Sequence, residues 1–401
     1  MLLYTTGIRI ASLWNKKAAL WVNGRKYFPK WKAGEPCIWM HSASLGEFEQ
    51  GRTVIEEIRK NYPNHRIVVT FFSPSGFQIR KNYPGADAVF YLPSDTHHNA
   101  KKFIELIQPS LVIWIKYDYW YHFLTALKSR NIPVLLVSGI FRENQPFFKS
   151  YGKLWREMLS AFSHLFVQNE HSFNLLKPIV QNKVSVNGDT RFDRVIDIAK
   201  EARDIDAVRL FCGTAQVIVA GSTWEEDEAQ LVHFVNTRPD TKFIIAPHEI
   251  TATHVSDVQR KFKNSILISV IDQNTAPLPH VLIIDNIGML SRLYKYATIA
   301  YVGGGFNTSG IHNILEAAVY GVPVIFGPIY SKFEEAKALV ELSGAFSFSN
   351  APELEKLFNE LLDDEAYLLK CGAVAGSYVR ANSGATKRIM DYIAENRLLT
   401  N

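Results

Sequence analysis

Cysteine is scarce in this sequence. Three cysteines occur among 401 residues, and they stand far apart, at Cys37, Cys212 and Cys371. They form neither the close spacing of a metal site nor an even-numbered disulfide framework. We therefore expect no structural metal, no disulfide bonds and a reducing compartment.

Long apolar runs are missing from the N-terminal region. A helix that spans a bilayer needs about 20 predominantly apolar residues, and polar and charged residues interrupt positions 1–34 too often for that. The order of charged start, apolar run and small-residue cleavage site that marks a secretory signal is also missing. We expect neither a spanning helix nor a cleaved signal peptide.

Acidic residues are absent from the same segment, 1–34. It combines Trp14, Trp21 and Trp31 with seven basic residues, which are Arg9, Lys16, Lys17, Arg25, Lys26, Lys30 and Lys32. Tryptophan with lysine and arginine suits a helix that lies on anionic lipid. A basic arm that packs on its own domain or binds nucleic acid is the alternative. Because no comparable basic aromatic patch occurs elsewhere, we predict attachment to a membrane surface and no nucleic acid partner.

The rest of the chain has the composition of a folded protein, since 47% of all residues are hydrophobic and 21% are charged. Its length suggests two domains. Helical patterns such as Ala100–Ile107 and Phe147–Phe162 alternate with short apolar runs of the kind that form buried parallel strands. The runs are Cys37–Met40, Ile67–Phe72, Ala88–Leu92, Leu111–Ile115, Val134–Val137, Leu165–Val167 and Val184–Val186. This alternation predicts a doubly wound α/β domain.

A second series of strand-like runs begins at Gln216, after a charged, helix-like connector over 191–213. These runs are Val217–Ala220, Phe243–Ala246, Ile266–Val270, Val281–Ile284, Thr298–Val302 and Val324–Phe326. The segment 353–399 has a helical pattern with little strand signal. We predict two α/β halves, and a cleft between two such halves is a natural ligand site.

One turn in the first half stands out, within WMHSASLGEFEQG at residues 39–51. It predicts a strand, a turn that contains Gly46, and a helix, and such turns lie at the sheet edge where open α/β sheets bind ligands. Glu47 would then lie in the first helical turn, where a carboxylate can act as a general base for a hydroxyl. The same pattern fits a capping box, with Ser44 as the N-cap and Glu47 at the third helical position. The local pattern leaves both interpretations open.

A glycine-rich turn stands out in the second half, within YVGGGFNTSGIHNILEAAVYG at residues 301–321. A strand runs into three glycines, 303–305, and the pattern predicts a helix that opens at Gly310. Glycines let a backbone approach a ligand closely, and N–H groups at a helix start attract phosphate. Glu316, four residues after His312, would face the same side and could bind the hydroxyls of a ribose. The alternative is a glycine turn that serves only close packing.

Three more strands of this half end in loops of a ligand-binding type, AGSTWEE, APHEI and DNIGML. The residues at their turns are Ser222, Thr223, Pro247, His248, Gly288 and Met289. The hydroxyls of the first loop could contact a phosphate or a sugar, or could equally cap the next helix. His248 and His254 do not have the HExxH spacing, so we predict no metal site.

In their order and spacing these segments resemble the Kdo transferases, which move 3-deoxy-D-manno-octulosonic acid (Kdo) from CMP-Kdo to a lipid A precursor. The resemblance covers nearly the whole chain. It is carried by the MLLYT start with its basic aromatic arm, and by WMHSASLGE, NGDTRFD, GSTWEEDE, GGGFNTSGIHNILEAAVYGVPVIFGP and KFEE.

The resemblance implies a fold and a division of the chain. It implies the α/β GT-B architecture, in which two Rossmann-like doubly wound domains face a central cleft, with no metal and no cofactor. The implied parts are a basic aromatic membrane-associating arm (1–34), an acceptor-binding domain (35–203), a CMP-Kdo-binding domain (204–375) and a C-terminal helix (376–401) that packs back on the N-terminal domain.

The resemblance also implies site residues. Glu47 matches the glutamate of the family's SVGE motif, the proposed base, and Glu316 matches the glutamate near the ribose. The family's RHPER motif of cytidine recognition aligns with Ala246–Ile250, without its arginines, and Lys116 stands where the motif ETELWPN has an acid. We predict Glu47 as the catalytic residue. The predicted substrate-binding residues are Ser44, Gly46, Arg142, Ser222, Thr223, Pro247, His248, Gly288, Met289, Gly304, Gly305, His312, Asn313 and Glu316.

The implied activity is transfer of Kdo from CMP-Kdo to the lipid A precursor lipid IVA, with inversion, in lipopolysaccharide biosynthesis. The implied location is the cytoplasmic face of the inner membrane, with an anionic membrane surface as a partner. A glutamate has an ordinary pKa of about 4.3, and a helix start would lower it further. We therefore expect Glu47 to be ionised at neutral pH.

Two other interpretations stay open. The chain could be another GT-B enzyme that uses a nucleotide sugar, such as a transferase or an epimerase of a UDP-sugar. It could also be a non-catalytic lipid-binding protein that uses the basic arm. Thermal stabilisation by CMP rather than by UDP would distinguish a Kdo transferase from the first alternative. Formation of product would distinguish it from the second.

Overall fold

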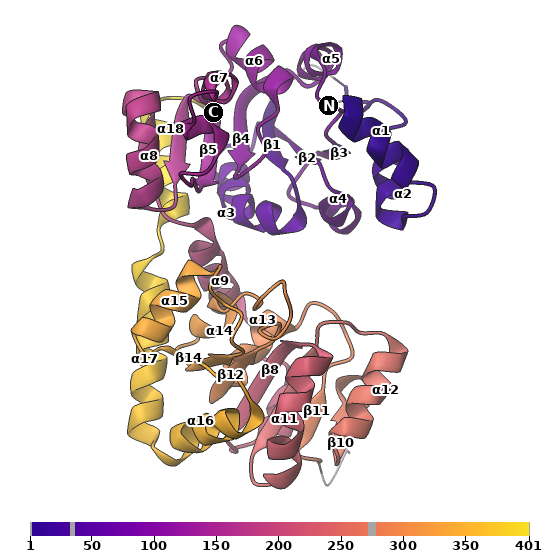
Figure 1. Cartoon of the computed structure of the whole chain (residues 1–401), viewed down its shortest axis with the longest axis vertical. Coiled ribbons are helices and arrows are strands. Elements are labelled where there is room, and N and C mark those ends of the chain that lie inside the picture. The colour runs from indigo at the N-terminus through magenta and orange to yellow at the C-terminus, as the bar shows by residue number, and fades with distance from the viewer. Residues whose placement is uncertain (1, 33–36, 272–277, 401) are drawn as a thin grey trace. The chain divides into compact units, whose positions relative to one another are not determined.

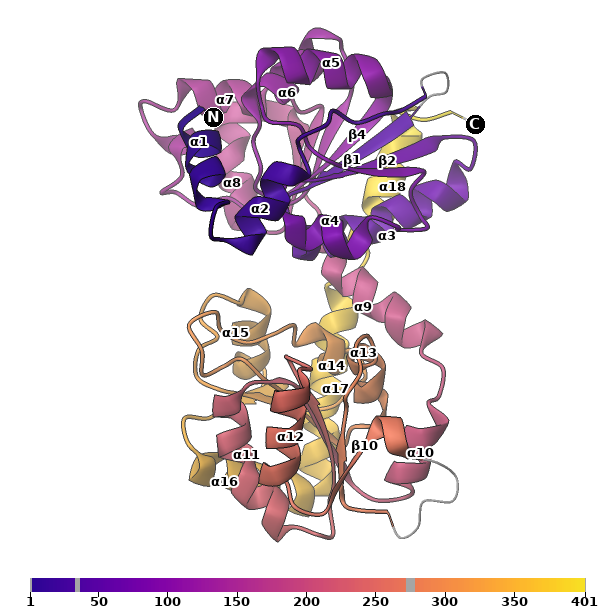
Figure 2. The same cartoon turned by 90° about the vertical axis from the view of Figure 1, so that its right-hand side faces the viewer.

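A computed structural model describes residues 2–32, 37–271 and 278–400. The chain forms two compact units (Figures 1 and 2). Unit 1 comprises Met1–Arg194 and Ser383–Asn401, and unit 2 comprises Val195–Asn382. The divisions thus fall some residues away from the predicted borders at 203/204 and 375/376. Each unit is a parallel sheet with helices on both faces, so the predicted α/β class with two doubly wound units is confirmed.

Unit 1 contains a seven-stranded parallel sheet in the order β3-β2-β1-β4-β5-β6-β7. Its strands are β1 (Cys37–Ser42), β2 (Arg66–Phe71), β3 (Ala88–Tyr91), β4 (Pro109–Ile115), β5 (Val134–Gly139), β6 (His164–Val167) and β7 (Val184–Val186). All seven predicted runs are therefore strands. Their apolar side chains alternate between two core clusters, one on each face of the sheet.

Helices of unit 1 cover both faces of this sheet, as Figure 2 shows. One cluster contains side chains of α3 (Leu45–Asn61) and of α18 (Ala385–Glu395), with α4 (Pro74–Arg80) beside them. The other contains side chains of α5 (His97–Ile107), α6 (Tyr121–Ser129), α7 (Lys153–Leu159) and α8 (Glu170–Val180). The helix α18 therefore belongs to the core of unit 1, although unit 2 precedes it in the sequence.

The helix predicted over Phe147–Phe162 is wrong in extent. Two shorter elements occupy this stretch, the 3-10 turn η1 (Pro146–Phe148) and α7. Between them Gly152 packs on the backbone, because a Cβ there would lie 2.0 Å from the carbonyl oxygen of Pro146. Residues 149–152 form a turn in which the N–H of Gly152 donates to the carbonyl oxygen of Lys149, so the two elements are separate.

The N-terminal arm folds onto unit 1 as α1 (Leu2–Ala11) and α2 (Lys16–Asn23). Arg25 attaches it: Nε donates to the carbonyl oxygen of Leu92 at 2.8 Å, and Nη2 to that of Phe72 at 2.7 Å. The guanidinium also lies 4.0 Å from the ring centre of Trp21. Residues 1, 33 and 34 of the predicted arm lie outside the described residues. In the described parts of the chain, no helix combines the length and the apolar character needed to cross a bilayer.

Unit 2 contains a second seven-stranded parallel sheet, in the order β10-β11-β9-β8-β12-β13-β14. Its strands are β8 (Val217–Thr223), β9 (Lys242–Pro247), β10 (Ser265–Leu267), β11 (Val281–Ile283), β12 (Ile299–Val302), β13 (Val324–Phe326) and β14 (Ala345–Ser347). The six predicted runs are present, although the run Ile266–Val270 leaves the strand after Leu267 and continues as the 3-10 turn η3 (Ile268–Val270). The edge strand β14 is not predicted by the sequence.

Helices connect the strands of unit 2 and link it to unit 1. The predicted connector consists of α9 (Thr190–Glu201), which starts in unit 1, and α10 (Asp206–Cys212). The other helices of unit 2 are α11 (Glu225–Thr237), α12 (Ala252–Lys261), α13 (Leu290–Leu293), α14 (Leu315–Ala318), α15 (Glu334–Glu341), α16 (Ala351–Asp363) and α17 (Glu365–Ala381). The remaining 3-10 turns are η4 (Tyr294–Tyr296) in unit 2 and η2 (Gln181–Lys183) in unit 1. Side chains of α11, α12 and α16 pack with the strands in one core cluster.

Candidate functional site

Glu47 lies in the first turn of α3, directly after β1. Ser44 is the N-cap, and its backbone N–H donates to Glu47 Oε2 at 2.9 Å while its hydroxyl lies 3.3 Å from the same oxygen. The capping box that the sequence indicates is thus formed. Because β1 pairs in parallel with β2 and β4, this turn stands at the carboxyl edge of the sheet, next to the loop that follows β4.

The electrostatic state of Glu47 differs from the expectation. Burial and, to a smaller extent, the carboxylate of Asp118 raise the pKa of Glu47 to about 7, although the Ser44 N–H bond and the charge of Lys116 act in the opposite direction. The expectation of a lowered pKa is therefore wrong, because loss of hydration outweighs the helix start. A carboxylate with a pKa near neutral pH is well suited to take up a proton from a hydroxyl.

A buried histidine, His41, lies near the end of β1, close to this edge of the sheet. His41 Nδ1 lies 2.9 Å from Thr70 Oγ1, and His41 Nε2 accepts a hydrogen bond from Trp120 Nε1 at 3.2 Å. The same Nε2 lies 3.5 Å from Asp118 Oδ2. Neither His41 nor Asp118 is among the site residues predicted from the sequence. The available signal is a histidine and a threonine in otherwise apolar neighbouring strands, and the register places them opposite each other.

Positive side chains surround the same edge of unit 1. Lys116, directly after β4, has a left-handed backbone with φ of 51°, and its charge acts on Glu47. Arg142 is exposed in the loop after β5, and its charge acts on Tyr117, whose pKa burial nevertheless raises. Gly46 does not serve close packing, because a Cβ on it would meet open space. The edge therefore offers room and positive charge beside the carboxylates of Glu47 and Asp118.

Two cavities flank the N-terminal arm. One, of about 460 Å³, is lined by Arg9, Arg25 and Lys26 with hydroxyl and aromatic side chains and no acidic residue. The other, of about 350 Å³, is mostly apolar, and Trp21 and Phe72 line it. The ring of Phe72 lies 4.7 Å from that of Trp120, so the apolar cavity adjoins the residues around His41. On the outside of the arm, Leu13 is 81% exposed and Trp14 is 72% exposed.

In unit 2 the glycine turn after β12 is tightly packed. Gly304 has a φ of 92°, and its N–H donates to Asp227 Oδ2 at 2.8 Å. A Cβ on Gly303 would lie 2.2 Å from the carbonyl oxygen of Ser222, and a Cβ on Gly305 would lie 2.6 Å from the backbone of Gly327. Close packing and a positive φ thus account for these glycines. Asp227, which accepts hydrogen bonds from Gly304 and Tyr301, is not among the predicted site residues.

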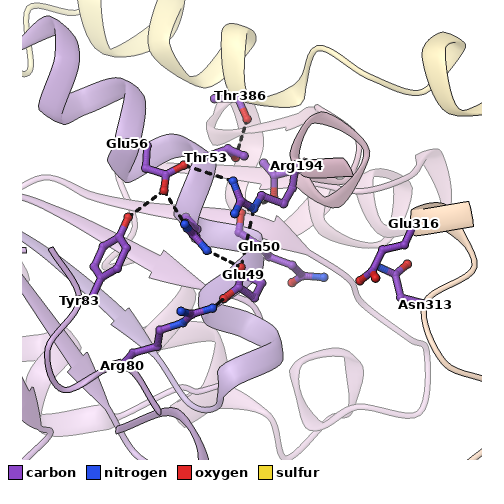
Figure 3. Close-up of polar contacts among 12 residues, drawn as sticks. Glu49, Gln50, Thr53, Glu56, Arg80, Tyr83, Arg194, Asn313, Glu316 and Thr386 are labelled. Carbon is purple, nitrogen blue, oxygen red and sulfur yellow. Dashed lines mark hydrogen bonds and ion pairs between the residues drawn. The ribbon is translucent and has the colours of Figure 1, made fainter. Parts of the chain in front are cut away.

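The helix predicted from Gly310 begins later. Gly310 has a φ of 85°, and α14 covers only Leu315–Ala318. The idea that His312 and Glu316 share a helix face is therefore wrong, because His312 lies before the helix. Asn313 joins the two parts instead, because its Oδ1 accepts from the N–H of Leu315 at 3.2 Å. Its Nδ2 donates to Glu316 Oε1 at 3.1 Å (Figure 3).

Three rings of unit 2 stack at the carboxyl edge of its sheet. The ring of His248 lies 4.6 Å from that of Trp224 and 4.4 Å from that of His312, with interplanar angles of 25° and 30°. Trp224 Nε1 donates to His312 Nε2 at 3.2 Å, and the N–H of His248 donates to the carbonyl oxygen of Thr223. Burial, with a smaller effect of His248, lowers the pKa of His312 to about 4. His312 is therefore neutral at physiological pH.

The remaining predicted residues lie at the ends of the same strands. Ser222, near the end of β8, has a φ of 55°, and Thr223 Oγ1 lies 3.5 Å from the buried Glu228. Pro247 ends β9. Gly288 (φ of 92°) and Met289 form the turn before α13. Within the described ranges, no three His, Cys, Asp or Glu side chains come close enough together to hold a metal ion.

Comparison with known proteins gives a consistent result. Residues 21–194 match the family model described as 3-Deoxy-D-manno-octulosonic-acid transferase (kdotransferase). The chain is 30% identical over 366 residues to the 3-deoxy-D-manno-octulosonic acid transferase of Chlamydia trachomatis serovar A, with 85% of this chain and 84% of that protein covered. It is 27% identical over 351 residues to the enzyme of that name from Aquifex aeolicus, with 84% and 90% covered.

Among solved structures, the chain resembles the UDP-GlcNAc 2-epimerase of Neisseria meningitidis bound to UDP-GlcNAc. The TM-score is 0.63, the identity is 17%, and the match covers 89% of this chain and 99% of that chain. At this identity the likeness concerns the fold alone. It agrees with the GT-B class predicted from the sequence.

Proposed function

Because the chain belongs to the 3-deoxy-D-manno-octulosonic-acid transferase family, we propose that it transfers Kdo from CMP-Kdo to a lipid A precursor, with inversion and with Glu47 as the general base. Family membership makes the chain a glycosyltransferase of lipopolysaccharide biosynthesis. The proposal concerns its donor, its acceptor, its membrane attachment and the roles of its residues.

The observation that carries the proposal is the state of Glu47. It is a largely buried carboxylate at a sheet edge, with a pKa of about 7. In the proposed step, an acceptor hydroxyl oxygen forms a bond to the anomeric carbon of Kdo while the bond from that carbon to the phosphate of CMP breaks. Glu47 accepts the hydroxyl proton, and CMP leaves with the bonding electrons. Attack from the side opposite the leaving group accounts for inversion.

Unit 2 is proposed to bind the CMP part. Glu316 has one carboxylate oxygen bonded to Asn313, and in this proposal the carboxylate also accepts hydrogen bonds from the ribose hydroxyls. The flat stack of Trp224, His248 and His312 offers neutral aromatic surface near the same strand ends. A neutral His312 neither attracts nor repels the phosphate, so the stack is suited to contact rather than to proton transfer.

Unit 1 is proposed to bind the lipid acceptor. The basic cavity and the apolar cavity beside the arm match the two parts of a phosphorylated, acylated molecule. Exposed Leu13 and Trp14 stand on the same arm as the seven basic residues, a combination that favours an anionic membrane surface. We propose that the arm attaches the enzyme to the cytoplasmic face of the inner membrane.

Lys116 and Arg142 are proposed to steer the substrates, because both CMP-Kdo and the acceptor are anionic. The charge of Lys116 acts on Glu47, and the charge of Arg142 acts on Tyr117, the residue that follows Lys116. Since the family motif has an acid at the position of Lys116, this lysine is the first place to look for a change in substrate preference.

A transfer assay tests the proposal. Wild type, Glu47→Gln and Glu170→Gln are incubated with freshly generated CMP-Kdo and lipid IVA, and the product is detected by mass. Glu170 is the matched control, since it is an exposed glutamate in the first turn of another helix of unit 1. We expect product from wild type and the control but not from Glu47→Gln. Product from Glu47→Gln at the wild-type rate would remove Glu47 from the mechanism.

A ligand panel separates the donor from the base. CMP, UDP and cytidine are each tested for thermal stabilisation of wild type and of Glu47→Gln. We expect CMP to stabilise both proteins equally, because the proposed nucleotide site lies in unit 2. Stabilisation by UDP without an effect of CMP would reject the proposed donor while leaving the family assignment intact.

A further inference from the structure

The helix that carries Glu47, α3, also contacts the two segments at which the chain passes between unit 1 and unit 2. The first part of unit 1 ends at Arg194, within α9, and the second part starts at Ser383, just before α18. Figure 3 shows side chains of both segments against α3. We call residues 190–194 and 383–386 the crossing segments.

Two uncharged contacts join the crossing segments to α3. Thr190 Oγ1 donates to the carbonyl oxygen of Gln50, and Thr53 Oγ1 lies 2.8 Å from Thr386 Oγ1. Gln50 stands one helical turn after Glu47, and Thr53 stands one turn after Gln50. Both threonine contacts are buried from solvent. The turns of α3 that follow Glu47 are therefore attached to both segments.

Asp193 joins the crossing segments to each other. Its Oδ1 accepts from the N–H of Gly384 at 2.5 Å, and its Oδ2 accepts from the N–H of Thr386 at 2.6 Å. Hydrogen bonds from backbone N–H groups to an ionised carboxylate are among the stronger ones in proteins. The two segments thus form one fixed support, although almost two hundred residues separate them in the sequence.

A charged cluster on the neighbouring face of α3 adds Arg194 to this support. Arg194 Nη1 lies 3.5 Å from Glu56 Oε2, and Arg194 Nε lies 3.8 Å from Glu49 Oε2. The side chain of Arg194 is 16% exposed, so solvent screens these pairs only partly. Arg194 is thus a charged link between a crossing segment and two glutamates of α3, Glu49 and Glu56 (Figure 3).

Two other arginines share the same glutamates. Arg52 Nε lies 2.7 Å from Glu56 Oε1, within α3 itself, and Arg80 Nη2 lies 2.5 Å from Glu49 Oε1, from α4. Removing Arg52 therefore removes an ion pair to Glu56 without touching a crossing segment. Arg52 is therefore a matched control for Arg194, because it pairs with the same two glutamates, Glu49 and Glu56.

We propose that Arg194 is a positioning residue for Glu47, through α3. The inference rests on the proposed role of Glu47 as the base. The raised pKa of Glu47 comes mainly from burial of its carboxyl group, and the ion pairs of Arg194 hold the turns of α3 that follow. If α3 shifts, the first turn becomes more hydrated, and Glu47 loses both its alignment with the acceptor hydroxyl and its raised pKa.

The test compares Arg194→Ala, Arg194→Lys and Arg52→Ala in the full chain, with kcat and the donor KM measured from pH 5 to 9. We expect Arg194→Ala to lower kcat about ten- to a hundredfold with an unchanged donor KM, and to move the acid limb of the pH profile to lower pH. Arg194→Lys should recover part of both effects, and Arg52→Ala should keep the wild-type acid limb. An unchanged acid limb in Arg194→Ala, or the same shift in Arg52→Ala, would overturn the inference.

A direct titration keeps this test independent of turnover. Glutamate labelled with 13C at the carboxyl carbon is titrated by NMR, and the signal of Glu47 is identified by its loss in Glu47→Gln. We expect the Glu47 midpoint to fall in Arg194→Ala and not in Arg52→Ala. If the midpoint falls although wild type makes no product, the positioning holds and the proposed function fails. If wild type is active and the midpoint is unchanged, the positioning fails. Thermal unfolding of each variant shows that it is folded.

Discussion

The two units share one kind of sheet and differ in what stands at its carboxyl edge. In unit 1 the turn after β1 leads into the 17-residue helix α3 and presents a carboxylate. In unit 2 the turn after β12 is made of glycines, and the helix α14 that follows has four residues. Burial acts on a titratable group in both places, and it favours the neutral form in both.

This common effect has opposite consequences. Burial raises the pKa of Glu47 to about 7, which leaves it able to exchange a proton near neutral pH. It lowers the pKa of His312 to about 4, which leaves that ring neutral over the whole physiological range. Under the proposed function, this difference corresponds to proton transfer in unit 1 and contact with the nucleotide in unit 2.

The strongest test of this division of roles between the two units is the removal of the Glu316 carboxylate. We expect Glu316→Ala to weaken CMP binding about ten- to a hundredfold, because a charged acceptor contributes roughly 1.5–3 kcal/mol per hydrogen bond. The pH profile of kcat should keep its acid limb, since Glu47 is untouched. Calorimetry with CMP and a pH–rate profile measure both. Unchanged CMP affinity would remove Glu316 from the nucleotide site.

A second test concerns the arm of unit 1. Trp14 is 72% exposed, and Trp14→Glu should weaken binding to anionic vesicles about tenfold, because it removes apolar surface worth about 1.5–3 kcal/mol on burial. Val270→Glu, at an exposed apolar position of unit 2, is the control and should bind as wild type does. Equal vesicle binding by all three proteins in a sedimentation assay would contradict the role of the arm.

The pH dependence of activity sharpens the role assigned to unit 1. Glu47 must be ionised to accept a proton, so kcat should rise with pH around a midpoint of about 7. Since the charge of Asp118 raises this pKa, Asp118→Asn should move the midpoint to lower pH, by less than one unit because burial is the larger cause. A midpoint that stays in place would show that Asp118 does not act on Glu47.

The smallest expected effect is on stability. The pKa of Glu47 is about 7 in the folded chain and 4.5 for the isolated group, so the folded state favours the protonated form. Its stabilisation is present below about pH 4.5 and is lost as the pH rises through 7. Glu47→Gln should therefore unfold at higher urea than wild type at pH 8, by on the order of 1–2 kcal/mol, and almost equally at pH 4.5. A difference of the same size at both pH values would contradict the raised pKa.

Most strands could be predicted because buried parallel strands are continuous apolar runs that local sequence reveals. The strand β14 could not, since Ala345–Ser347 is short and mixed, and only its pairing with β13 makes it a strand. The helix expected from Gly310 does not form there, and just before α14 begins the side chain of Asn313 accepts a hydrogen bond from the N–H of Leu315. Such local competition between side chain and backbone is hard to read from pattern alone.

Within the candidate site, the position of Glu47 and its capping box follow from a strand–turn–helix pattern. Its raised pKa cannot be predicted from that pattern. The causes are burial by elements far apart in the sequence and the carboxylate of Asp118, in the loop after β4. Asp227 was missed for the same reason: its partners, Gly304 and Tyr301, lie more than seventy residues away. Local sequence indicates which side chains can react, and tertiary structure decides their charge.

Unit 1 is formed by two parts of the chain that are separated by all of unit 2, and this affects how it folds during synthesis. Ile389 and Ile393 of α18 are fully buried in the core cluster that also contains residues of α3. During synthesis this core stays incomplete while all of unit 2 is translated, which takes roughly ten to forty seconds at ~5–20 residues per second. The apolar surface of α3 and of the sheet that α18 covers in the folded protein is uncovered in the meantime. Unit 2 should therefore reach its native state on the ribosome before the unit that precedes it.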